Sequence, residues 1–405
     1  MAGKKRVLLF IYNSLKDPLF QNLVLEYIKS LSLTNSNLKF YLITFEQKQY
    51  QVQPMYRDEI RKELLNHRIR WYPLGFHTGR HLLIYKAWDF IQAIFLAVFI
   101  RIRHQTSFLF AFANVSAAFA IILKKILWMK MIIYSYEPHS EFMIEMGYWE
   151  KNDLKFKLLH YLEELAGRDA EYIMTGTQYM VDRLRSRGSN AQIFRAPTAV
   201  DGEKFYFRPG GAQKVRKHLK ILDKKVVLYL GKFGGLYYRD EIPQFFSYLR
   251  KRIDEAFFLV ATPNDFQEIN NLFLKYLPPD VFHIAVGLPS EEIKNYLSVA
   301  DMGLGGIPSF PSQRYRSPTK IAEYLLSGVP YITCKGISED DIYAERYKVG
   351  VVLRDYSESD LDKNFSKILE LLNTPKDQLR THCREVGLEY RSKSRIDEIF
   401  RKILS

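Results

Sequence analysis

Residues 311–334 decide the fold class of this chain; they read Pro-Ser-Gln-Arg-Tyr-Arg-Ser-Pro-Thr-Lys-Ile-Ala-Glu-Tyr-Leu-Leu-Ser-Gly-Val-Pro-Tyr-Ile-Thr-Cys. The stretch predicts a basic loop, a short helix and a buried strand. Ser317 can cap a helix that opens with Pro318, and Gly328 can take the left-handed turn that ends it. Apolar residues at 321, 322, 325 and 326 share one helix face, so we expect that face to pack in a core.

The start of this predicted helix is basic, although the partial positive charge of a helix N-terminus favours acidic residues. Arg314, Arg316 and Lys320 surround the start, and no acidic residue lies between Asp301 and Glu323. Three cations and free backbone N–H groups suit a bound anion. Glu323, one turn further, can accept hydrogen bonds from sugar hydroxyls. The alternative is a solvated basic loop with an exposed Lys320–Glu323 ion pair.

Length and charge narrow the class of protein. A chain of 405 residues predicts two domains of roughly 200 residues each. The net charge of +14 favours nucleic acid, anionic lipid or phosphorylated ligands as partners. Nucleic acid is not predicted, because the sequence contains no recognition-helix pattern, zinc knuckle or aromatic-basic strip. With two cysteines, Cys334 and Cys383, and no secretory signal, the chain is expected in the reducing cytoplasm.

One segment, residues 82–100, is very apolar and bears on membrane association. Polar and charged residues interrupt or follow it: Lys86, Asp89, Gln92, Arg101, Arg103 and His104. These interruptions argue against a membrane-spanning helix. Either a core helix or a helix at an anionic membrane surface is expected, the latter placing the protein at the inner face of the membrane.

Strand-like and helix-like segments alternate along the chain. The main expected strands are 7–12, 39–45, 107–112, 131–134, 172–175, 226–230, 257–261, 281–286, 302–305, 329–333 and 350–353. This alternation predicts an α/β fold of doubly wound parallel sheets covered by helices on both faces. Residues 196–225, which contain Pro197, Pro209, Gly210 and Gly211, break the rhythm and predict the boundary between two domains.

Several motifs appear in a fixed order. They are Leu-Gly-Lys at 230–232, Leu-Pro-Ser-Glu-Glu-Ile at 288–293, Ala-Asp-Met-Gly-Leu at 300–304, Ser-Pro-Thr-Lys…Glu-Tyr…Ser-Gly-Val-Pro at 317–330, and the hinge-like Ala-Pro-Thr-Ala-Val-Asp-Gly-Glu-Lys-Phe at 196–205. Together they resemble the retaining nucleotide-sugar glycosyltransferases of family four, which have the GT-B fold. The resemblance implies an acceptor-side Rossmann-like domain at 1–197 and a nucleotide-sugar-binding domain at 198–388. It also implies an interdomain cleft and a C-terminal helix, 389–405, that crosses back to the first domain.

The resemblance also implies roles for residues of the second half. Glu323 matches the second glutamate of the family's Glu–seven residues–Glu motif, which binds the ribose of the nucleotide. Lys232 matches the basic residue that neutralises the diphosphate, with Arg239 as a second such residue. An ordinary surface lysine is the alternative for Lys232, although loops at the carboxyl ends of strands face the ligand in such folds.

The distal phosphate would be held at the helix start by Arg316, Ser317, Thr319 and Lys320. One departure stands out: Tyr315 occupies the place of the first glutamate of the family motif. The usual contact to the transferred sugar is therefore unassigned. The loop 13–17 also lacks the glycines that many relatives place near the donor sugar.

His139 is the candidate catalytic residue of the first half. It lies in the sequence Tyr-Glu-Pro-His-Ser-Glu after an expected strand, where Glu137 and Glu141 could orient its imidazole. A structural histidine is the alternative. The acidic run 339–341 is explained by capping of a short helix. Neither a metal nor a cofactor is expected, because family members bind the diphosphate with cations and amides.

The sequence therefore predicts a glycosyltransferase that moves a sugar from a nucleotide diphosphate to a glycan or lipid-linked acceptor in cell-surface polysaccharide synthesis. A catalytically silent nucleotide-sugar-binding partner or sensor is a second possibility, favoured by Tyr315. A sugar-nucleotide epimerase is a third; it would need several acid–base residues, of which only His139 is apparent.

Overall fold

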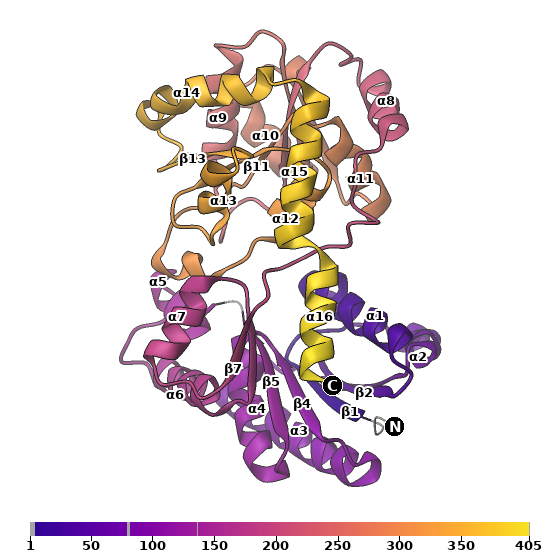
Figure 1. The fold of residues 1–405 in the computed structure, drawn as a ribbon. Helices are drawn as coiled ribbons and strands as arrows, with labels where there is room; N and C mark the ends of the chain where they lie inside the picture. Colours follow the sequence, from indigo (N-terminus) through magenta and orange to yellow (C-terminus); the bar gives the residue numbers. More distant parts are fainter. Residues whose placement is uncertain (1–4, 79–81, 136, 405) are drawn as a thin grey trace. The chain divides into compact units, whose positions relative to one another are not determined.

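The computed structural model describes residues 5–78, 82–135 and 137–404 (Figure 1). Packing of the chain defines two compact units. Unit 1 consists of Met1–Ala196 with Ser394–Ser405, and unit 2 consists of Pro197–Lys393. The chain therefore returns to unit 1 with its last helix, α16 (Lys393–Ile403). There Phe400 packs against Phe110, with ring centroids 5.7 Å apart.

Unit 1 is built on a seven-stranded sheet in which every described pair of neighbours is parallel. The spatial order is β3-β2-β1-β4-β5-β6-β7, so the winding direction reverses between β1 and β4. The strands are β1 (Lys5–Ile11), β2 (Leu38–Glu46), β3 (Ile69–Gly75), β4 (Phe108–Phe112), β5 (Lys130–Ser135), β6 (Tyr172–Thr175) and β7 (Gln192–Arg195). β4 is buried throughout, and β1 is buried from Val7 to Ile11, as expected for a parallel sheet covered on both faces.

The helices of unit 1 connect these strands. They are α1 (Glu26–Thr34), α2 (Arg57–Asn66), α3 (Leu82–His104), α4 (Ala113–Leu127), α5 (His139–Glu145), α6 (Leu154–Asp169) and α7 (Gln178–Ser186). A π-helical segment, Phe20–Leu25, precedes α1. The helix α5 begins at His139, directly after Pro138.

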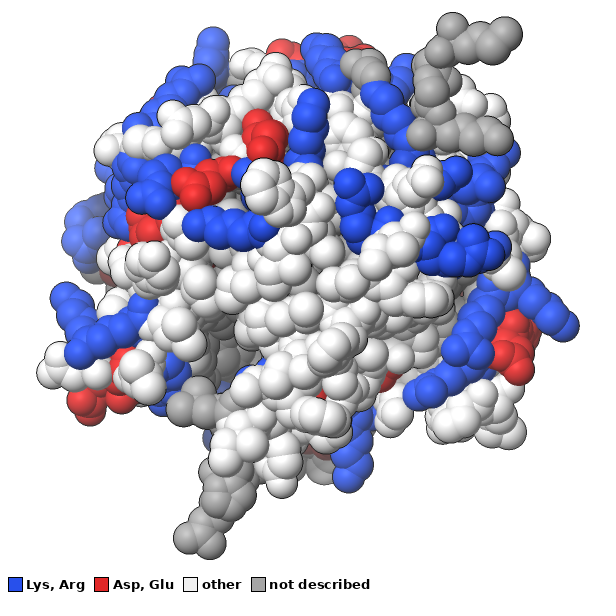
Figure 2. All heavy atoms as spheres, turned by 90° about the horizontal axis from the view of Figure 1, so that it is seen from below, with Lys and Arg blue, Asp and Glu red and all other residues white. Residues whose placement is uncertain are grey.

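The helix α3 packs with only one of its faces. Ala93, Ala97 and Ile100 are buried, while the outward face is also apolar. That outward face is made by Ile84, Trp88, Ile91, Phe95, Phe99 and Ile102, of which Phe95 is 73% and Ile102 75% exposed. Figure 2 shows this side of the molecule, where a broad uncharged surface is bordered by Lys and Arg. Within the described residues, no helix combines the length and apolar character needed to span a bilayer.

Unit 2 contains a second parallel sheet, of six strands, in the order β10-β9-β8-β11-β12-β13. Its strands are β8 (Lys225–Leu230), β9 (Ala256–Thr262), β10 (Phe282–Val286), β11 (Met302–Leu304), β12 (Tyr331–Cys334) and β13 (Gly350–Leu353). Its helices are α8 (Pro209–His218), α9 (Glu241–Arg250), α10 (Phe266–Leu274), α11 (Ser290–Val299), α12 (Thr319–Leu326), α13 (Asp340–Arg346), α14 (Glu358–Asn373) and α15 (Lys376–Arg391). The winding reverses between β8 and β11, which makes their carboxyl ends the place where such folds bind ligands.

The end of α15 is fixed inside unit 2 by a buried ion pair. Arg391 and Asp340 each have side chains only 1% exposed, and the guanidinium donates to the Asp340 carboxylate. Arg391 also donates to the carbonyl of Thr198 at 3.0 Å and to the hydroxyl of Ser317. The predicted start of the returning helix, residue 389, therefore falls within α15, and the return begins only after Arg391.

Candidate functional site

The predicted helix of the opening stretch lies at the point where the sheet of unit 2 reverses its winding. The hydroxyl of Tyr324 in α12 accepts a hydrogen bond from the backbone N–H of Leu230 at 3.1 Å and donates to the carbonyl of Leu304 at 3.2 Å. Leu230 ends β8 and Leu304 ends β11. Gly303 makes room for this ring, because a Cβ there would lie 2.7 Å from it. The tyrosine thus holds α12 against the carboxyl ends of both strands.

Lys320, in the first turn of α12, is the central cation of this site. It is only 8% exposed, and its ammonium donates to the carbonyl of Gly305 at 2.9 Å. The Nζ atom also lies 4.7 Å from the ring centroid of Tyr229 and 4.6 Å from that of Tyr237, within the range of cation–π attraction. Gly231 permits this approach, because a Cβ there would be 2.8 Å from Nζ. Burial lowers the pKa of Lys320 to about 7, and Glu323 opposes that shift.

Glu323 lies one turn further along α12 and is half-buried. Burial raises the pKa of its carboxyl to about 7, against the attraction of the Lys320 charge. The alternative of a solvated Lys320–Glu323 pair on the surface is wrong, because Lys320 is buried and its ammonium binds Gly305. A bound anion would offset the unfavourable burial of the lysine charge.

The beginning of α12 differs in detail from the prediction. Pro318 is the N-cap residue and not the first helical residue, and no side chain caps the helix. The predicted capping residue, Ser317, is buried and accepts a hydrogen bond from the backbone N–H of Thr198 at 2.9 Å as well as one from Arg391. Because its hydroxyl serves the packing of unit 2, Ser317 does not cap the helix. The N–H groups that follow, from Thr319 onward, therefore lack a side-chain acceptor.

The remaining predicted cations differ in their surroundings. Arg316 is half-buried and directly precedes Ser317, so it lies at the start of α12. Lys232 is exposed in the loop after β8, and its carbonyl accepts a hydrogen bond from Tyr229. Arg239 is instead paired with Glu268 of α10, with Nη2 and Oε1 2.9 Å apart. The structure thus gathers the α12 residues at one site and leaves Arg239 in a surface ion pair.

The candidate catalytic residue of unit 1, His139, is the first residue of α5. Its Nδ1 lies 4.0 Å from Oε1 of Glu137, but Glu141 does not orient it, because that carboxylate pairs with Arg183 at 2.6 Å. Glu163, which was not among the predicted site residues, accepts hydrogen bonds on its carboxylate from the backbone N–H groups of His139 at 3.1 Å and of Ser140 at 3.2 Å.

Glu163 therefore caps α5 from a different helix, α6. Burial raises the pKa of this carboxyl to about 7, in spite of the hydrogen bonds that favour its charged form. No local sequence signal indicates this role, because the capping residue lies 24 positions after His139, the first residue of the helix that it caps. The effect is to fix the backbone of His139.

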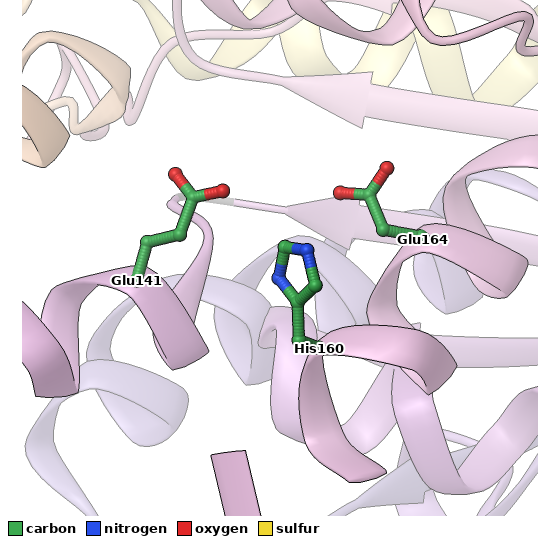
Figure 3. Close-up of side chains that lie close together, drawn as sticks. All are labelled: Glu141, His160 and Glu164. Carbon is green, nitrogen blue, oxygen red and sulfur yellow. The ribbon is translucent and has the colours of Figure 1, made fainter. Parts of the chain in front are cut away.

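Three side chains of unit 1 lie close enough to one another to hold a metal ion: Glu141 of α5 and His160 and Glu164 of α6 (Figure 3). Their charge is already compensated. Arg183 lies 2.6 Å from Glu141 and 3.5 Å from Glu164, and Arg187 also pairs with both carboxylates. Two guanidinium groups at these distances disfavour a divalent cation by direct repulsion. The arrangement is best described as an ion-pair network that joins α5, α6 and α7.

The acidic run 339–341 has structural partners. Asp340 binds Arg391, and the Asp341 carboxylate accepts a hydrogen bond from the backbone N–H of Gly336 at 2.8 Å. Asp340 and Asp341 form the first turn of α13, where acidic residues favour the helix dipole.

No protein-family model matches this sequence, and no curated protein matches it either. Solved structures do match over nearly the whole chain. HepE from Anabaena in complex with UDP has a TM-score of 0.71 at 12% identity, with 99% of each chain covered. Sucrose-phosphate synthase from Thermosynechococcus elongatus has a TM-score of 0.72 at 15% identity, covering 98% of this chain and 99% of the other. WaaG, a glycosyltransferase of lipopolysaccharide biosynthesis, has a TM-score of 0.63 at 12% identity, covering 97% and 98%.

At such low identities these likenesses establish the fold. The two parallel sheets, of seven and six strands with helices on both faces, are those of the GT-B class, and this confirms the predicted fold class.

Proposed function

We propose that the chain is a glycosyltransferase that takes a sugar from a nucleotide diphosphate donor and transfers it, with retention of configuration, to a hydroxyl acceptor. The observation that carries this proposal is the buried ammonium of Lys320 at the uncapped start of α12, beside the carboxyl ends of β8 and β11. A buried cation next to free helix N–H groups is a site for an anion, and a diphosphate is the anion that such a donor supplies.

In this proposal the donor lies along α12. Glu323 accepts hydrogen bonds from the ribose hydroxyls, while Lys320, Arg316 and Lys232 carry the positive charge for the diphosphate. The same cations would stabilise the charge that develops on the leaving diphosphate, which is the main catalytic contribution expected in the absence of a metal. His139, held at the start of α5, is proposed as the polar residue that assists transfer. The neighbours in complex with UDP and UDP-glucose support a uridine donor.

A second candidate is a catalytically silent protein that binds a nucleotide sugar as a partner or sensor. Tyr315, at the end of the 3-10 segment Pro311–Tyr315, favours it, because a phenol cannot replace a carboxylate in binding the transferred sugar. Transfer and binding must therefore be measured separately.

The test uses the full chain with UDP-glucose and with matched ADP- and GDP-sugars. At a concentration of a hundred times its dissociation constant, the true donor should stabilise the protein by about 2.7 kcal/mol, which thermal denaturation detects. The same donor should then be hydrolysed or transferred to an added acceptor. Stabilisation without turnover would support the silent binder, and no stabilisation by any nucleotide sugar would contradict both proposals.

We further propose that the acceptor is a glycan or a lipid-linked glycan of cell-surface polysaccharide, reached at the inner face of a membrane. The support is the outward face of α3, whose apolar residues are exposed beside the cations that surround this surface. A helix that places apolar residues outward with a basic border is typical of an interfacial helix on anionic lipid.

This association predicts binding to vesicles of phosphatidylcholine mixed with phosphatidylglycerol, and release by salt, since exposed charges are screened within a Debye length of about 8 Å at physiological ionic strength. Phe95→Ser should weaken binding by about tenfold or more, because it removes a large apolar side chain from the lipid. Met55→Ser is the matched control, since Met55 is 75% exposed in the 3-10 segment Pro54–Tyr56, which precedes α2 in the same unit. Equal loss in the two variants would identify the face of α3 as unrelated to lipid. Equal binding to pure phosphatidylcholine would show that the basic border does not contribute to membrane binding.

A further inference from the structure

A basic pocket lies at the amino-terminal edge of the sheet of unit 1. Its volume is about 420 Å³. The cationic residues that line it are Arg6, Lys39, Arg68, Arg70 and Arg103, together with His104. They come from the beginnings of β1, β2 and β3 and from the end of α3. The pocket is therefore at the opposite edge of this sheet from the carboxyl ends of its strands, where such folds bind their substrates.

No carboxylate balances these charges within the pocket, because no Asp or Glu is among the described residues that line it. The contacts of the cations are to carbonyl groups. Arg6 donates to the carbonyl of His104 at 2.6 Å, and Arg68 donates to the carbonyl of Ser32. Other cations of unit 1 do have acidic partners, as Lys29 pairs with Glu63 at 2.9 Å and Lys124 with Glu171 at 2.8 Å. Five positive charges without an acidic partner in one cavity favour a multiply charged anion.

The positive charges of the pocket affect the pKa of its histidine, His104. The His104 ring stacks on Tyr41, with centroids 4.3 Å apart. Burial lowers the pKa of His104, and Arg70, Arg103, Arg6 and Lys39 lower it further. A bound anion would oppose the effect of these four charges.

The pocket lies next to the outward apolar face of α3 along the helix. That face ends at Phe99 and Ile102, and the next residues, Arg103 and His104, line the pocket. If the apolar residues enter the hydrocarbon boundary of a bilayer, the end of α3 lies at the depth of the headgroups, where lipid phosphates are found. A pocket of this volume accommodates a phosphate group with its adjoining glycerol.

We infer that this pocket binds the phosphomonoester headgroup of an anionic lipid while the outward face of α3 rests on the membrane. The inference rests on the membrane association proposed above and adds a defined headgroup site to it. A phosphomonoester is favoured over a phosphodiester because it carries up to two charges and three acceptor oxygens, which suit several guanidinium groups at once.

The test compares vesicles of phosphatidylcholine containing either phosphatidic acid or phosphatidylglycerol, adjusted to equal surface charge. The parent protein should prefer phosphatidic acid by about tenfold, as one additional charged hydrogen bond provides. Arg70→Gln with Arg103→Gln should abolish this preference. Lys125→Gln with Lys130→Gln is the control: it removes two exposed charges outside the pocket and should keep the preference, although both variants lose overall affinity.

A parent without preference at equal surface charge, or a preference that falls equally in both variants, would overturn the headgroup site while leaving membrane association intact. Failure of the parent to bind any anionic vesicle would overturn both. Inorganic phosphate and short-chain phosphatidic acid provide the last comparison: if inorganic phosphate displaces the protein from vesicles as effectively, the pocket binds free phosphate and the lipid assignment is wrong. UDP-sugar binding, measured on the same samples, tests the donor proposal independently.

Discussion

Replacing Arg391 by Met is expected to destabilise unit 2 by about 3–5 kcal/mol, because it leaves the buried carboxylate of Asp340 without its partner. Burial already raises the pKa of Asp340, and Arg391 is what opposes this shift. The variant also removes donors from the Thr198 carbonyl and the Ser317 hydroxyl. For a unit of this size the melting temperature should fall by about 6–20 °C.

Two variants make this measurement specific. Lys367→Met, an exposed lysine on α14, should change the stability by less than about 0.5 kcal/mol, as surface substitutions usually do. Arg391→Met combined with Asp340→Leu should recover much of the loss, since a buried ion pair is often replaced by apolar side chains at little cost. A melting temperature of Arg391→Met equal to that of Lys367→Met would show that the buried pair contributes nothing. The segment before α12 should also loosen, because Arg391 binds Ser317.

Glu323→Ala should weaken nucleotide binding by about ten- to a hundredfold, since hydrogen bonds to a charged acceptor contribute about 1.5–3 kcal/mol. Glu345→Ala, which changes an exposed glutamate of α13, is the control and should leave the affinity unchanged. Lys320→Met should weaken UDP far more than uridine, because only the diphosphate requires the ammonium charge. Calorimetry with UDP and uridine measures both effects, and an unchanged affinity of Glu323→Ala would show that the donor site is misplaced.

The pKa of Lys320 predicts the direction in which the affinity for UDP changes with pH. Because burial lowers that pKa to about 7, the side chain is an ammonium below this pH and loses its charge above it. A diphosphate binds the charged form, so the affinity for UDP relative to uridine should fall as the pH is raised from 7 to 9. Lys320→Met should abolish this fall. If the ratio of the affinities for UDP and uridine stays constant with pH in the parent protein, the ammonium of Lys320 does not bind the diphosphate.

The positions of individual helices and strands could be predicted from the sequence. The helix expected to open with Pro318 is α12, which begins one residue later, and the strand expected at 329–333 is β12 (Tyr331–Cys334). The end of the helix was also predicted correctly, because Gly328 takes a positive φ of +76° and its N–H donates to the carbonyl of Leu325 at 2.9 Å. These features follow from neighbouring residues, because apolar spacing and left-handed turns are local properties. The same kinds of signal, found along the whole chain, predict the alternation of strands and helices.

What the sequence left open depends on contacts between distant residues. Ser317 was a reasonable cap from its position, but it binds Thr198, which is 119 residues away. Glu163 caps α5 only because the packing of α6 brings it there. The apolar segment of α3 is similar on all sides in sequence, so only packing decided that Ala93, Ala97 and Ile100 face inward and Phe95 faces outward.

The candidate donor site shows most clearly the difference between what the sequence determines and what tertiary packing determines. The sequence by itself determined that Lys320 and Glu323 stand one turn apart near a helix start, since that follows from their spacing. Only the tertiary structure decided that Lys320 is buried between Gly305, Tyr229 and Tyr237 at the point where the sheet reverses its winding. The physical reason is that the desolvation of a charge depends on the atoms around it, which three separate segments of the chain supply.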